Sequence, residues 1–110
     1  MLKFDNTITL SNKLAVIVPK EHKLSEFYVA KLQSVLSDFF GGATATDCSG
    51  AYVMEDGSLC LEQNVIVYAY YDTMSTEQEE RLVQLVLNMK HDMKQECIGI
   101  EQNGVFQMVF

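Results

Sequence analysis

Two segments with helical periodicity, each lying between runs of strand-forming residues, constrain the fold of this 110-residue chain most strongly. Between residues 26 and 40, apolar side chains recur at intervals of three or four, as on the core-facing side of an amphipathic helix. A second stripe of this kind follows Thr76 and consists of Leu82, Leu85, Val86, Met89 and Met93. The chain is therefore expected to form two helices that are separated by strands.

Signals at the helix ends support both helices. Ser25 is expected to cap the first helix, and Gly41 and Gly42 follow it, where glycine readily takes the left-handed conformation that ends a helix. Thr76 and Glu79 have the spacing of a capping box at the start of the second helix. The boundaries of the two helices are thus predicted from residue types as well as from periodicity.

Seven short runs of β-branched, aromatic and aliphatic residues predict strands. Two hairpin turns are expected at Asp56-Gly57 and Asn103-Gly104, because both central positions of such turns favour positive φ. Gln63 and Asn64 are interpreted as a bulge between two runs, and residues 43–50 as a linking segment of small residues. The predicted strands cover residues 7–10, 14–18, 51–54, 59–62, 65–71, 97–102 and 105–110.

This order, ββ-α-βββ-α-ββ, predicts a single α+β domain over residues 1–110. We expect an antiparallel sheet with both helices packed on one face, as in a ferredoxin-like or split βαβ sandwich. The opposite face of the sheet is then open. Such a face has to carry polar residues, bind another molecule or self-associate.

Composition excludes several classes of protein. A formal net charge of −7 with one arginine, Arg81, argues against binding to nucleic acid or to an anionic membrane. The longest apolar run, residues 14–18, is far too short to span a bilayer. Because the N-terminus does not resemble a signal peptide and the three cysteines are an odd set, a cytoplasmic protein with reduced thiols is expected.

Motifs for catalysis, metals or cofactors are not found. Gly41 and Gly42 follow a helix, whereas a phosphate-binding loop precedes one. Cys48 lies in a polar segment, but neither histidine has sequence features that would place it beside the thiol. No Cys-x-x-Cys, His-x-x-x-His or spaced carboxylate set is present. We therefore expect no catalytic residue, no metal site and no cofactor.

A group of tyrosines is the most distinctive surface feature. The period of two places Tyr68 and Tyr70 on the same face of their strand. If that face is open, Tyr52 and either Glu62 or Asn64 complete an amphipathic patch suited to a protein partner or a small ligand. The alternative is that these tyrosines pack at the sheet edge with their hydroxyl groups in water.

The leading hypothesis is a non-catalytic binding or regulatory module that uses the open face for a protein partner, self-association or a small ligand, and the chain is expected not to be an enzyme. One alternative is an acidic inhibitor that mimics nucleic acid and blocks a basic groove of a host-defence protein. Another is a small enzyme centred on Cys48, or on Glu62 with neighbouring tyrosines. The small size suits a phage or mobile element.

Overall fold

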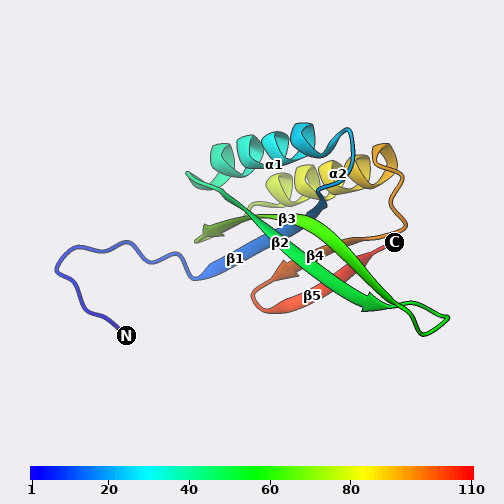
Figure 1. Ribbon diagram of the computed structural model, residues 1–110. Coiled ribbons are helices and arrows are strands. Elements are labelled where there is room, and N and C mark those ends of the chain that lie inside the picture. Colours follow the sequence, from blue (N-terminus) through cyan, green and yellow to red (C-terminus); the bar gives the residue numbers. More distant parts are fainter.

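The computed structural model describes residues 1–110 and contains a five-stranded antiparallel sheet with two helices on one face (Figure 1). The strand order is β2-β3-β1-β4-β5, so that the predicted α+β sandwich is confirmed. The elements are β1 (Asn12–Pro19), α1 (Ser25–Phe40), β2 (Thr44–Val53), β3 (Leu59–Tyr71), α2 (Thr76–Asp92), β4 (Ile98–Gln102) and β5 (Val105–Val109).

The hydrophobic core lies between the helices and the three central strands. β1 is the middle strand, and its Leu14, Val16 and Val18 point toward the helices and are buried. They pack with Leu32 and Met89 from the two helices in one cluster. Alternate residues of β1 and β3 therefore point to the face without helices, which we call the open face.

The start of α1 differs from its prediction. Leu24 is the N-cap and makes no side-chain capping bond, whereas Ser25 is the first helical residue and is buried. The Leu24 amide donates instead to Nδ1 of His22 at 3.0 Å. At the other end Gly41, with φ of +92°, donates its amide to the Ser37 carbonyl, as predicted for a glycine that ends a helix.

The capping box of α2 is present but lies one residue earlier than predicted. The Ser75 hydroxyl accepts from the Gln78 amide at 3.1 Å, and the Gln78 side chain accepts from the Ser75 amide at 3.0 Å. The predicted pair, Thr76 and Glu79, has the same spacing. Local sequence allows both registers. Ser75 is the N-cap in the structure, since its backbone is extended, as that of an N-cap residue is.

Both hairpins form, although with different turns. Asn103 and Gly104 have φ of +53° and +82°, as the predicted two-residue turn requires. In the other hairpin only Gly57 has positive φ, and the turn is wider because the Met54 amide donates to the Ser58 carbonyl. Asp56 stabilises this turn by accepting from the Ser58 amide and hydroxyl.

Three strand predictions are wrong. Residues 7–10 form no strand and are exposed, since no neighbouring strand pairs with them. Residues 44–50, predicted as a linking segment, belong to β2 because each pairs with a residue of β3. β3 itself runs without a bulge through Gln63 and Asn64, which pair one to one with Ser49 and Cys48.

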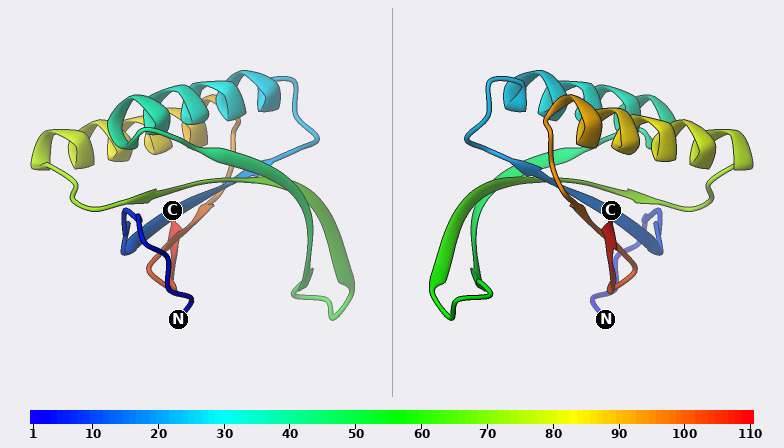
Figure 2. Two further views of the ribbon diagram at one scale, coloured as in Figure 1. Left: turned by 90° about the vertical axis from the view of Figure 1, so that its left-hand side faces the viewer. Right: turned by 90° about the vertical axis from the view of Figure 1, so that its right-hand side faces the viewer.

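The β2–β3 hairpin extends beyond the body of the protein as an arm, defined here as residues 49–63. Apart from one bond at its base, in which the Lys20 amide donates to the Gln63 carbonyl at 3.0 Å, its two strands pair with each other. They bend away from the helices, toward the open side of the sheet (Figure 2). None of the residues of the hydrophobic core comes from it. Neither helix is long and apolar enough to cross a membrane.

Candidate functional site

One end of the open face carries a group of two tyrosines and a lysine. The rings of Tyr68 and Tyr70 meet edge to face with centroids 5.9 Å apart. Nζ of Lys13, on the neighbouring strand β1, lies 4.8 Å from the centroid of Tyr68 and 5.9 Å from that of Tyr70. Both tyrosines point away from the helices, because Val67, Ala69 and Tyr71 on the opposite side of the strand are buried. The sequence grouped Tyr68 with Tyr70 but left open which face of the sheet the helices cover.

A second group of polar side chains lies on the arm. Tyr52 pairs with Cys60 across the two strands, and Glu62 lies two residues further along β3 on the same face. The pKa of Tyr52 is raised, first by a hydrogen bond with the Cys60 side chain and by the negative charge of that side chain, then by burial, and last by the carboxylates of Glu62 and Glu96. Tyr52 therefore keeps its proton and can donate a hydrogen bond at neutral pH.

The five residues predicted as a binding patch do not form one cluster in a single chain. Tyr52 and Glu62 lie together on the arm, and Tyr68 and Tyr70 lie together near the far end of β3. Tyr68 lies six positions after Glu62, which corresponds to about 20 Å along a strand. Asn64 lies between the two groups and is buried, opposite Cys48 and Pro19.

Glu101 belongs to the same face, although the sequence analysis did not predict it as a site residue. It pairs with Ala15, which also pairs with Tyr68, so that the three residues form one row across β4, β1 and β3. Two strand spacings separate Glu101 from Tyr68, about 10 Å. Between the carboxylate and the ring lies the small Ala15 side chain, which is itself buried.

Phe106 lies beside this row on the edge strand β5. A Cβ atom built on Gly99 would lie 2.7 Å from Cζ of Phe106 and 3.2 Å from Cδ1 of Ile17. The Phe106 ring therefore lies directly over Gly99, and only glycine leaves room for it. With more than half of its surface exposed, Phe106 extends the apolar part of the open face toward Met108.

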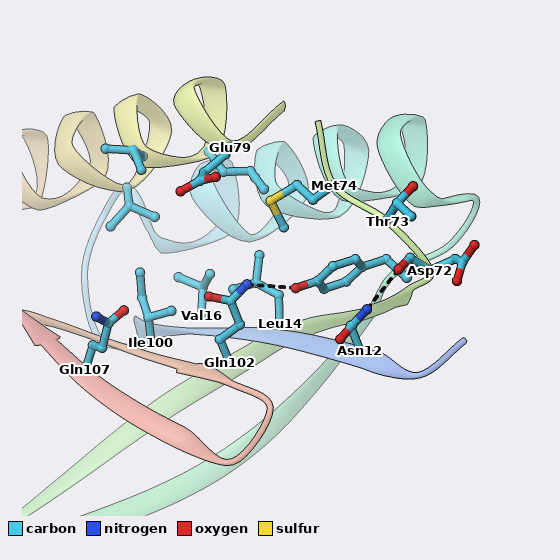
Figure 3. Close-up of a pocket in the computed structure, with 14 residues that line it drawn as sticks. Asn12, Leu14, Val16, Asp72, Thr73, Met74, Glu79, Ile100, Gln102 and Gln107 are labelled. Atoms are coloured by element: carbon cyan, nitrogen blue, oxygen red, sulfur yellow. Dashed lines mark hydrogen bonds between the residues drawn. The ribbon is translucent and has the colours of Figure 1, made fainter. Parts of the chain in front are cut away.

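The helix side of the sheet contains a cavity of about 550 Å³ beneath α2 (Figure 3). Its floor is formed by β1 and β4 and its roof by α2. Nε2 of Gln102 donates to the Tyr71 hydroxyl at 2.7 Å, and Nδ2 of Asn12 donates to the Asp72 carbonyl at 2.8 Å. The lining residues are Asn12, Leu14, Val16, Tyr71, Asp72, Thr73, Met74, Glu79, Leu82, Val83, Val86, Ile100, Gln102 and Gln107.

Cysteine and metal chemistry find no support in the geometry. Cys48 lies opposite Asn64, while Nδ1 of His22 accepts from a backbone amide and His91 belongs to the last turn of α2. No histidine is hydrogen-bonded to the thiol. No cluster of three or more histidine, cysteine, aspartate or glutamate side chains is arranged to hold a metal ion.

No protein-family model and no curated protein matches the chain. Among solved structures, a phage SAM lyase in complex with S-methyl-5′-thioadenosine is similar, with a TM-score of 0.62 and 19% sequence identity. The match covers 98% of this chain and 94% of that one. The same coverage holds for a phage SAM lyase in the apo state, with a TM-score of 0.58 and 20% identity.

A Bacillus cereus protein related to NIF3 also matches, with a TM-score of 0.55 and 13% identity. This match covers 89% of the present chain but 26% of the other, so that the shared fold is one part of a larger protein. All three matches support the same α+β fold.

The comparisons correct the leading functional hypothesis. The chain was expected to be a non-catalytic module and not an enzyme, but the structures that match it over almost its whole length are those of an enzyme. The alternative of a small enzyme agrees better with this likeness. The error arose because the sequence contains no motif that assembles a nucleophile with a base, and the absence of such a motif was counted against catalysis.

Proposed function

We propose that this chain is an enzyme that cleaves a sulfonium nucleoside of the S-adenosylmethionine (SAM) type. The observation that carries the proposal is the likeness to phage SAM lyase over 98% of the chain, in a structure that holds S-methyl-5′-thioadenosine. Such a substrate is made inside cells, and the cytoplasm is the compartment that we propose for the reaction.

The open face offers suitable groups for this substrate. A sulfonium centre is a cation, and carboxylates and aromatic rings attract cations. Glu62 and Glu101 supply carboxylates, while Tyr68 and Tyr70 supply rings, with Tyr52 as a hydrogen-bond donor. The net charge of −7 adds a general attraction for a positively charged substrate.

The reaction balances without a co-reactant. The bond between sulfur and Cγ of the amino acid side chain breaks, and its electron pair remains on sulfur, which gives neutral S-methyl-5′-thioadenosine. Cγ is attacked by the carboxylate of the same amino acid group, which gives a cyclic ester, homoserine lactone. Because a positive and a negative charge disappear together, surroundings with little water lower the barrier. The protein has to fold the substrate and exclude water.

A second copy of the chain is proposed to complete this site. A small-molecule site normally buries most of its ligand, whereas Tyr52 and Tyr70 are each about half exposed in the single chain. The arm also exposes Val53, Leu59 and Leu61. Self-association over the open face would cover these residues and enclose the substrate. Light scattering is expected to give an oligomer, and a monomer at about 50 µM contradicts this part of the proposal.

The proposed activity is tested by incubating the purified protein with SAM and measuring S-methyl-5′-thioadenosine by liquid chromatography. Glu62→Gln and Glu101→Gln are each expected to lower the rate by about a hundredfold, equivalent to about 2.7 kcal/mol. Glu55→Gln, in the turn at the tip of the arm, is the matched control and should keep the activity. The proposal is wrong if wild-type protein produces no more thioether than buffer does.

A further inference from the structure

The cavity beneath α2 lies on the helix side of the sheet, away from the site proposed on the open face. Apolar side chains form its floor and its roof, with Leu14, Val16 and Ile100 below (Figure 3). Leu82 and Val86 of α2 line it from the roof. Its volume of about 550 Å³ lies within the range of small-molecule sites. A mostly apolar body of several carbon atoms therefore fits between the two layers.

The polar groups of the cavity have a single sign. Glu79 points over the cavity from the first turns of α2 (Figure 3), and none of the lining residues is a lysine, arginine or histidine. The one ion pair of the protein joins Lys20 to Asp47, so that Glu79 has no cationic partner. Asp72 also lines the cavity, and both carboxylates are exposed to solvent, so the cavity carries negative charge only and favours a positively charged ligand.

Neighbouring amides add further acceptors. Nε2 of Gln102 is used in the bond to the Tyr71 hydroxyl, which leaves Oε1 of Gln102 free to accept. Tyr71 is 95% buried by its neighbours and stacks against Phe40, with ring centroids 4.8 Å apart, so its hydroxyl is held in place. Gln107, on the edge strand β5, has no partner within the protein and offers another carbonyl. These acceptors complement the N–H donors of an ammonium group.

We infer that this cavity is a second binding site, specific for a small organic amine with an apolar body. The carboxylate of Glu79 and the carbonyl oxygens of Gln102 and Gln107 receive the ammonium group. The aliphatic floor and roof receive the hydrocarbon part. The inference does not depend on the reaction proposed for the open face.

Phenethylamine is a suitable probe, with 2-phenylethanol and 3-phenylpropionate as neutral and anionic counterparts of similar shape. In an NMR titration of uniformly ¹⁵N-labelled protein, phenethylamine should bind with a Kd of about 1 mM or lower. It should shift the side-chain amide signals of Gln102 and Gln107. The alcohol should bind at least fivefold more weakly, and the anion should not bind. Equal binding of all three compounds overturns the inference.

Two pairs of variants locate the site. Glu79→Gln should weaken phenethylamine binding at least fivefold, whereas Glu80→Gln, the neighbouring residue outside the cavity, should not. Val83→Phe should fill the cavity and abolish binding, whereas Leu87→Phe, one turn later on α2 and also partly exposed, should not. Unchanged binding in Glu79→Gln or Val83→Phe overturns the inference. SAM cleavage by the Glu79→Gln and Val83→Phe proteins is measured separately. It reports on the site proposed on the open face and not on amine binding in the cavity.

Discussion

At the residue scale, Tyr28 joins the two helices. Its hydroxyl donates to the carboxylate of Asp92, which belongs to the last turn of α2. The pKa of Tyr28 is raised to about 12, mainly because the side chain is buried, and further by the hydrogen bond to Asp92 and its negative charge. The neutral tyrosine is thus the form that the folded protein stabilises.

This shift predicts a pH dependence of stability. An unfolded tyrosine ionises near pH 10, so the contribution of Tyr28 is complete below that pH and is lost as the pH rises toward 12. At pH 8, Tyr28→Phe should lower the free energy of unfolding by about 1.5 kcal/mol. Urea denaturation should show the difference from wild type narrowing between pH 10 and pH 12. A difference independent of pH contradicts the assignment.

Gly99 provides a second prediction at this scale. Gly99→Ala should cost about 1 kcal/mol, because the added methyl group meets the Phe106 ring on the open face. In a Phe106→Ala background the same change should be neutral or stabilising, since alanine restricts the unfolded chain more than glycine does. Thermal unfolding of the four proteins of this double-mutant cycle tests the contact. Equal effects in both backgrounds would show that the two residues do not interact.

At the element scale, helix α2 begins with a capping box whose register differs by one residue from the prediction. Ser75→Ala should lower the free energy of unfolding by about 1 kcal/mol, because the Gln78 amide loses its acceptor. Thr76→Ala is the informative control and should have little effect. Chemical denaturation distinguishes the two residues, and a larger loss at Thr76 would restore the register expected from sequence.

The sequence predicted those elements whose signals are local. Both helices and the Asn103-Gly104 turn are encoded in neighbouring residues, and they were predicted close to their observed positions. The first part of β2 was not predicted, because residues 44–50 are small and polar and become a strand only by pairing with β3. Conversely, residues 7–10 alternate like a strand but have no partner.

The candidate site was predicted only in part, for the same reason. A period of two correctly grouped Tyr68 with Tyr70, since that relation lies within one strand. Glu101 comes from β4, and its place in the row with Ala15 and Tyr68 depends on the strand order. The cavity under α2 brings together side chains from four strands and a helix, and no local pattern indicates such an arrangement.

At the scale of the whole molecule, the chain is more extended than a compact domain of its length. Its radius of gyration is 15.4 Å, whereas about 13 Å is typical for 110 residues. The arm and the exposed N-terminal segment account for the difference (Figures 1 and 2). Both expose apolar side chains, which agrees with the proposed self-association.

Removing the arm should therefore separate folding from activity. If residues 50–62 are replaced by an Asn-Gly turn, all residues of the hydrophobic core remain, and the shortened strands keep a two-residue hairpin. The melting temperature should change by only about 5 °C, while SAM cleavage should be lost with Tyr52 and Glu62. Retained cleavage in this variant would exclude the arm from the proposed site, and loss of folding would show that the arm stabilises the body.

The separation of the arm from the core also has an evolutionary consequence. Substitutions between residues 50 and 62 leave the packed interior intact. Selection therefore acts on them only through their effect on contacts with a ligand or with a neighbouring subunit. Homologous chains should thus preserve the alternating aliphatic pattern of β1 while their hairpin tips diverge in length and chemistry. A scaffold built in this way can acquire new specificities by exchanging one projecting ribbon.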